Sequence, residues 1–144
     1  MELTRIRQLN DDIREEILRI IEIRSEAFPG AIRYDTIGGS HGTPENLMEN
    51  VIATVDIEAR KARLMLDFRR QERAEAVRII RRSDLSIAQR HILYLRYLAR
   101  HHDWTSLGWP EVYHWVNLYH NVEQRRMYEL HADAMKKIYK FAAQ

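Results

Sequence analysis

The side chains with the greatest potential for chemistry lie near the C-terminal end of the chain, on one predicted helix. The candidate contact residues are Gln124, Arg125, Arg126, Tyr128, Glu129, Lys136 and Lys137. Arginine can make paired hydrogen bonds to guanine, and lysine commonly binds phosphate. Arg125 is therefore the candidate for a base contact, and Lys136 and Lys137 are candidates for the phosphate backbone. Glu129 either accepts from a cytosine amino group or orients Arg125.

The helix that carries these residues is predicted to be amphipathic. Its apolar residues recur at spacings of three and four, which places them on one face: Met127, Leu130, Ala134, Ile138 and Phe141. The opposite face centres on Arg125, Glu129, Ala132 and Lys136. Such a helix can bury its back and present a basic front to nucleic acid. An ordinary amphipathic helix with a solvated outer face is the alternative.

A shorter helix is predicted just before it, from about Pro110 to Leu118. Proline suits a first helical position, because its missing N–H has no intrahelical partner there. The apolar side of this helix is expected to contain Val112, Trp115, Val116 and Leu118. Residues 119–121 are expected to form the break between this helix and the next one. Asn121 is the expected N-cap of the second helix, with Gln124 at the capping-box spacing.

A third helix precedes this pair. Ser86 is its expected N-cap, and the run His101-His102-Asp103 is expected to end it. The residues expected to bury it are Ile87, His91, Ile92, Leu93, Leu95 and Leu98. The three tryptophans, Trp104, Trp109 and Trp115, and the tyrosines are expected to belong to the core and not to a base-stacking platform.

Three stretches of this region carry a resemblance to region 4 of sigma-70-type factors. They are Arg90–Tyr97, Trp109–Val112 and Met127–Lys137, which read RHILYLRY, WPEV and MYELHADAMKK. In the family pattern an apolar helix precedes a helix-turn-helix, whose second helix recognises DNA. The whole chain is most similar to phage regulators of the RinA/ArpU type, in which long N-terminal helices come before such an end. The likeness covers about Leu85–Phe141.

The resemblance implies a sequence-specific DNA-binding regulator of phage or prophage late genes. Duplex DNA is then the partner, RNA polymerase is a further candidate partner, and the cytoplasm of a bacterial host is the place of action. It also implies that residues 83–144 form a three-helix, sigma-70 region 4-like helix-turn-helix domain. Two alternatives stay open: a small terminase-like subunit for DNA packaging, and a helical protein–protein adaptor without DNA contact.

Two long helices are predicted before residue 83. The first covers Leu3 to about Ala27, and its apolar residues recur at three- and four-residue steps. The second begins at Thr43-Pro44, with Thr43 as cap, and extends as far as Arg82. Its coiled-coil-like seam consists of Met48, Ile52, Val55, Ala59, Ala62 and Leu66. We expect the helices to form an antiparallel hairpin, or two copies of the chain to pair as a homodimer.

The expected organisation is therefore all-α. Residues 1–82 form an N-terminal hairpin and oligomerisation region that contains a Gly-rich loop at 29–43, and residues 83–144 form the DNA-binding domain. From Arg60 to Arg82 nine basic residues face three acidic ones, which favours contact with phosphates. A solvated helix surface that acidic residues of another helix balance is the alternative.

Composition and residue spacing argue against several other folds and classes of function. The chain has 144 residues and is 45% hydrophobic, with five glycines, three prolines and no cysteine, which argues against an all-β fold and against a thiolate metal site. No apolar run approaches the ~20 residues that span a bilayer. The cluster His101, His102 and Asp103, with His114 or His120, matches no metal-binding spacing. We therefore expect no enzyme, no catalytic residue, no metal and no cofactor.

Overall fold

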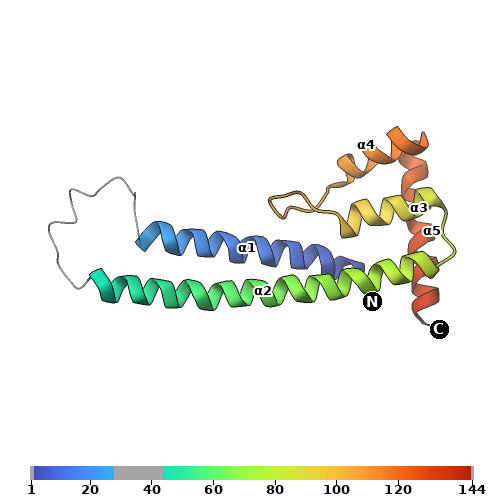
Figure 1. Cartoon of the computed structure of the whole chain (residues 1–144). Coiled ribbons are helices and arrows are strands. Elements are labelled where there is room, and N and C mark those ends of the chain that lie inside the picture. The colour runs from blue at the N-terminus through green and yellow to red at the C-terminus, as the bar shows by residue number, and fades with distance from the viewer. Residues whose placement is uncertain (1, 28–43, 144) are drawn as a thin grey trace. The chain divides into compact units, whose positions relative to one another are not determined.

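The computed structural model describes residues 2–27 and 44–143, with side chains in the second range described from residue 48. The described elements are α1 (Leu3–Ala27), α2 (Pro44–Arg82), α3 (Ile87–Leu93), the π-helical turn η2 (Tyr94–Leu98), α4 (Trp109–His120) and α5 (Gln124–Ala142). The fold is all-α, as predicted (Figure 1). The expected cap Thr43 and the Gly-rich loop at 29–43 lie outside the described residues. None of the described helices is long and apolar enough to cross a membrane.

The helices divide between two compact units. The hairpin unit is Asp12–Asp67, and the composite unit combines Met1–Asp11 with Phe68–Gln144. The predicted boundary between residues 82 and 83 does not coincide with this division. A break does follow Arg82, where α2 ends, but the end of α2 belongs to the same unit as α3, α4 and α5.

In the hairpin unit, the α1 and α2 segments run antiparallel, as expected (Figure 1). Arg19 of α1 pairs with Glu58 of α2 at 3.8 Å. Further along α1, Arg24 lines the same groove as Val51, which lies before Glu58 in α2. The two segments therefore run in opposite directions.

The predicted seam of α2 is only partly buried. Ala62 is buried, and Val55, Ala59 and Leu66 are half-buried. Met48 and Ile52 were expected in the seam, but their exposed fractions are 49% and 60%. A two-helix layer covers only the side of each helix that faces the other, so part of a wide apolar stripe remains in solvent.

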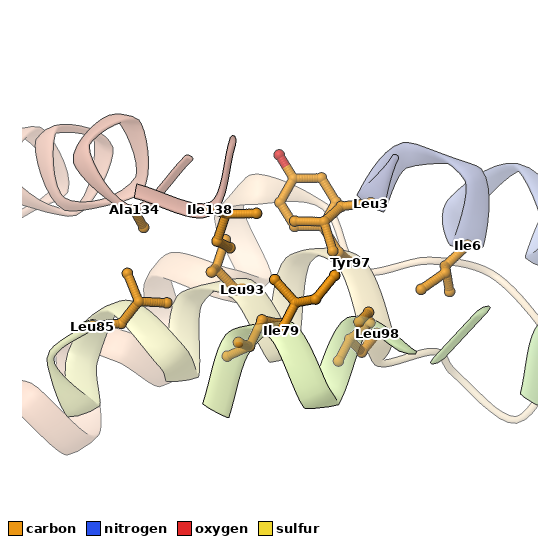
Figure 2. Packing of buried hydrophobic residues seen from close by; sticks show 11 residues of the cluster. Leu3, Ile6, Ile79, Leu85, Leu93, Tyr97, Leu98, Ala134 and Ile138 are labelled. Atoms are coloured by element: carbon orange, nitrogen blue, oxygen red, sulfur yellow. The ribbon is translucent and has the colours of Figure 1, made fainter. Parts of the chain in front are cut away.

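The composite unit holds two hydrophobic clusters. The first combines the start of α1, the end of α2, α3, η2 and α5; Figure 2 shows Leu3, Ile6, Ile79, Leu85, Leu93, Tyr97, Leu98, Ala134 and Ile138 of this cluster. The second joins α3, α4 and α5 through Ile92, Leu107, Val112, Val116 and Met127. A cut after residue 82 would pass through the first cluster, because Leu3, Ile6 and Ile79 lie on one side of the cut and Ile138 on the other.

Arg69 continues the apolar seam of α2 as a buried residue, 8% exposed, within the composite unit. Its Nε donates to Asn10 Oδ1 at 2.6 Å, and its Nη2 donates to the carbonyl of Leu98 at 3.0 Å. Burial lowers the pKa of Arg69, and the positive charges of Arg100 and Arg73 lower it further. Arg69 therefore ties α1 and α2 to the end of η2.

The third helix begins as predicted but ends earlier. Ser86 Oγ accepts from the N–H of Gln89 at 3.2 Å, and the Gln89 side chain accepts from the N–H of Ser86, which completes a capping box. The chain then passes into η2, where the N–H of Ala99 donates to the carbonyl of Tyr94 five residues back. The predicted end at His101–Asp103 is wrong, because Ala99 is already extended. Ile87 was expected to be buried but is 76% exposed.

Candidate nucleic-acid interface

Helices α4 and α5 are joined by three residues, 121–123. Asn121 lies in the left-handed region with φ 52° and ψ 48°, and its N–H donates to the carbonyl of Asn117 at 2.8 Å. The Asn117 side chain in turn donates to the carbonyl of Val122 at 3.1 Å. Val122 packs against the second cluster. The turn is thus held from both sides, and α5 crosses α4 (Figure 1).

The predicted capping of α5 is wrong. Asn121 ends α4 instead of beginning α5, because its left-handed backbone forms the C-cap. Glu123 occupies the N-cap position of α5 without a capping hydrogen bond from its side chain. Gln124 is consequently the first residue of α5, and the expected capping box with Asn121 does not form. Glycine is the usual residue at such a C-cap, and asparagine is the next most suitable.

The back of α5 is anchored in both clusters, as the sequence predicts. Met127 belongs to the second cluster, and Ala134 and Ile138 belong to the first. Leu130 and Phe141, which were expected on the same face, are half-buried against these clusters. The helix is therefore fixed along most of its length.

Polar contacts add to this anchoring. Gln89 Nε2 donates to the carbonyl of Leu130 at 3.2 Å and to Asp133 Oδ2 at 2.8 Å, and this contact lowers the pKa of the Asp133 carboxyl. Tyr97 lies with its hydroxyl 2.8 Å from His131 Nε2, and the two rings stack. Burial raises the pKa of Tyr97 and lowers that of His131, so this contact joins a neutral phenol and a neutral imidazole. No local pattern indicates the contacts of Gln89 with Leu130 and Asp133, since these two partners are remote in the chain.

The front of α5 carries the candidate residues. Gln124, Arg125, Arg126, Tyr128, Glu129 and Lys136 are exposed, and Lys137 is half-exposed. The side chain of Arg125 is 92% exposed. The structure therefore places all seven residues on the accessible part of one helix.

Two acidic residues interrupt the positive charge of this front. Glu129 lies 3.7 Å from Arg125 Nε and 3.2 Å from Arg126 Nη1. Asp133 lies 3.4 Å from Lys137 Nζ. With Lys136 and Lys140, five basic residues of α5 face two acidic ones. The geometry at Glu129 suits orientation of Arg125, which is one of its two expected roles.

The expectation that the aromatic residues belong to the core is only partly correct. Trp109 and Trp104 are half-buried, each under an arginine: Arg96 lies 4.4 Å from the ring of Trp109, and Arg100 lies 3.5 Å from that of Trp104. Trp115, expected on the apolar side of α4, is instead 40% exposed.

Further aromatic and apolar side chains lie exposed on α4 and α5. They are Leu118 and Tyr119 on α4, and Tyr128 and Tyr139 on α5. Leu118 was also expected on the buried side of α4. Tyr128 makes an edge contact with Trp109, with ring centroids 5.1 Å apart, so it links the front of α5 to the start of α4.

The basic stretch of α2 contributes less positive charge than its composition suggests. Arg69 is buried. Arg60 pairs with Asp56 at 2.9 Å and Lys61 with Glu58 at 3.6 Å. Acidic residues of the same helix therefore balance part of the stretch.

The histidines do not form the metal site that was considered. His101 pairs with Glu111 at 2.9 Å, and His91 Nδ1 lies 3.0 Å from His120 Nε2. Burial lowers the pKa of His91, and the charge of His120 lowers it further. Within the part of the chain that the structure describes, no three His, Asp or Glu residues are grouped so that they could hold a metal ion.

Comparison with models of protein families, with curated proteins and with solved structures gives no match for this chain.

Proposed function

We propose that this protein is a sequence-specific DNA-binding regulator of transcription, acting on phage or prophage late genes in the cytoplasm of a bacterial host. The observation that carries the proposal is α5, whose back is fixed in two clusters and whose exposed front is predominantly basic. A tight turn with a left-handed residue precedes it, as is common between the two helices of a helix-turn-helix. The resemblance to sigma-70 region 4 supports the same reading.

In this proposal α5 enters the major groove with its N-terminal turn foremost. Arg125 makes a bidentate contact to a guanine, and Glu129 holds its guanidinium in place. Lys136 and Lys137 lie further along the helix and contact the phosphate backbone. Base contacts determine the preferred sequence, whereas phosphate contacts mainly determine affinity.

The test begins with selection of a binding site from a random pool of duplexes, using the full chain. Arg125→Ala should then cost about 1–3 kcal/mol and relax the preference at one base pair. Lys137→Ala should weaken all sequences about equally. Arg14→Ala removes an exposed arginine of α1 and serves as the charge-matched control. Unchanged base preference of a folded Arg125→Ala protein would contradict a reading role for α5.

Salt dependence provides a second readout. Each phosphate that the protein neutralises should add about 0.9 to the slope of log affinity against log salt concentration. Lys137→Ala should therefore lower this slope by about 0.9, which is the contribution of one phosphate. Met127→Ala is the folding control, since truncation of this fully buried side chain should cost roughly 2–5 kcal/mol of stability. A slope near zero for the wild-type chain would remove DNA as the partner.

One observation favours the adaptor alternative. Trp115 and Tyr119 stack on α4 with centroids 6.2 Å apart, and Leu118 beside them is 62% exposed. Exposed aromatic residues are common at protein–protein contacts. RNA polymerase is the partner that the resemblance suggests for such a surface. Retained polymerase binding in the absence of DNA, lost on Trp115→Ala, would support this second function.

A further inference from the structure

The hairpin unit has an apolar groove on one side. It is formed between α1 and α2 and has a volume of ≈ 480 Å³. Its apolar lining consists of Val51, Ile52, Val55 and Ala59 of α2. Ile52 is 60% exposed. Large aliphatic side chains in such a position commonly mark a contact surface.

The charges at the rim of this groove indicate what covers it. Asp56 and Arg63 of α2 both line the groove, together with Arg24 of α1, and Asp56 also pairs with Arg60 of its own helix at 2.9 Å. Asp56 and Arg63 are seven residues apart, so they lie on the same side of the helix, about two turns from each other. Ala59 lies between them. Its small side chain permits close approach of another helix.

We propose that the groove binds the same groove of a second copy of this chain, in an isologous contact. When two α2 helices cross antiparallel about a two-fold axis beside Ala59, Asp56 of each copy meets Arg63 of the other. Both pairs then form at once, which is the property that a two-fold contact requires. Ile52 of each copy loses its exposure to solvent, and this burial supplies the main driving force.

The same helix offers a matched control surface. Ile57 and Leu64 are 59% and 70% exposed, yet neither lines the groove. Leu64→Glu therefore places the same charge on α2 as Ile52→Glu, at a comparably exposed position. Both side chains are more than half exposed, so both variants should keep the helical content of the wild-type protein.

The experiment is sedimentation equilibrium of the full chain over a range of concentrations. The wild-type protein and Leu64→Glu should dimerise, and Ile52→Glu should be a monomer. A monomeric wild type, an assembly larger than a dimer, or loss of the dimer in Leu64→Glu in place of Ile52→Glu would overturn the proposal.

A charge exchange tests the antiparallel register. Asp56→Arg and Arg63→Asp should each raise the dimer dissociation constant about three- to thirtyfold, and the double variant should recover most of this loss. A double variant as weak as the single ones would contradict the paired arrangement of Asp56 and Arg63. The dimer does not rest on the proposed DNA contact, and Arg125→Ala should leave the dissociation constant unchanged.

Discussion

Arg69 has a structural role inside the protein, whereas the basic stretch around it in the sequence favours contact with phosphates. It lies in a basic stretch, but its guanidinium is buried and makes hydrogen bonds to Asn10 and to the carbonyl of Leu98. Asn10 is itself fully buried and donates to Ser106 Oγ at 3.0 Å. The cation therefore joins three segments that are distant in the chain.

We expect Arg69→Ala to destabilise the protein by about 2–4 kcal/mol, because two hydrogen bonds to a charged group are lost and Asn10 is left without its donor. Urea unfolding followed by circular dichroism measures this loss. Arg73→Ala, at an exposed position one turn further on, is the control and should change stability by less than about 0.5 kcal/mol. Equal effects of the two substitutions would rule out the structural role of Arg69.

The carboxyls of Glu16 and Glu58 meet inside the hairpin unit. Burial raises the pKa of Glu16, and the neighbouring Glu58 raises it further, whereas the hydrogen bond from Glu16 lowers the pKa of Glu58. A raised folded-state pKa means that the folded state holds the proton of Glu16 more tightly than the unfolded state. The stabilisation from this proton is complete below the unfolded pKa of 4.5 and is lost as pH rises through the folded pKa.

We accordingly expect Glu16→Gln to raise the thermal midpoint at pH 7, because the amide still donates to Glu58 and carries no charge. The gain should shrink as pH falls below about 4.5, where Glu16 is itself protonated. Thermal unfolding at several pH values measures both effects. Glu15→Gln, at the adjacent exposed position, is the control and should give no such pH-dependent gain.

At the scale of elements, the turn between α4 and α5 depends on the backbone of Asn121. A left-handed conformation costs most residues about 1–2 kcal/mol, and asparagine and glycine tolerate it best. We expect Asn121→Ala to lower stability by about 1 kcal/mol and Asn121→Gly to be neutral or slightly stabilising. Chemical unfolding of the two variants distinguishes them. A glycine variant less stable than the alanine variant would contradict this account of the turn.

The helices were more predictable than the end of α3 and the turn between α4 and α5. The bounds of α1 and α2 and the N-cap at Ser86 follow from local sequence, because apolar periodicity and side-chain caps act within a few residues. Asn121 was assigned to the wrong helix because asparagine suits both an N-cap and a left-handed C-cap. In the structure Asn121 takes the left-handed C-cap, and Val122 next to it packs on the second cluster.

The candidate site shows the same limit. The amphipathic pattern of α5 predicted which residues lie on its front and which on its back. It did not predict that Asp133 is held by Gln89, or that Trp115 and Leu118 remain exposed. This contact and these exposures depend on which helix packs against each side chain. The periodicity of a single helix does not specify its neighbours.

For the whole molecule, the first cluster determines which pieces can fold. Leu3, Ile6, Ala76, Ile79 and Ile80 supply about half of its buried residues and all precede residue 83. We therefore expect a fragment of residues 84–144 to lose most of its cooperative unfolding and to bind a dye that reports exposed apolar surface. Calorimetry of the fragment and the full chain provides the comparison. A sharp transition in the fragment would support a domain boundary near residue 83.

The position of Trp109 gives the protein an optical reporter close to its candidate interface. Its indole contacts Tyr128 and His131 of α5 and lies beneath the guanidinium of Arg96. Trp104 and Trp115 have other surroundings, and replacing both by phenylalanine leaves Trp109 as the sole indole emitter. A ligand that displaces Tyr128 should then change the intensity and wavelength of its fluorescence, so occupancy of α5 can be followed without any attached label.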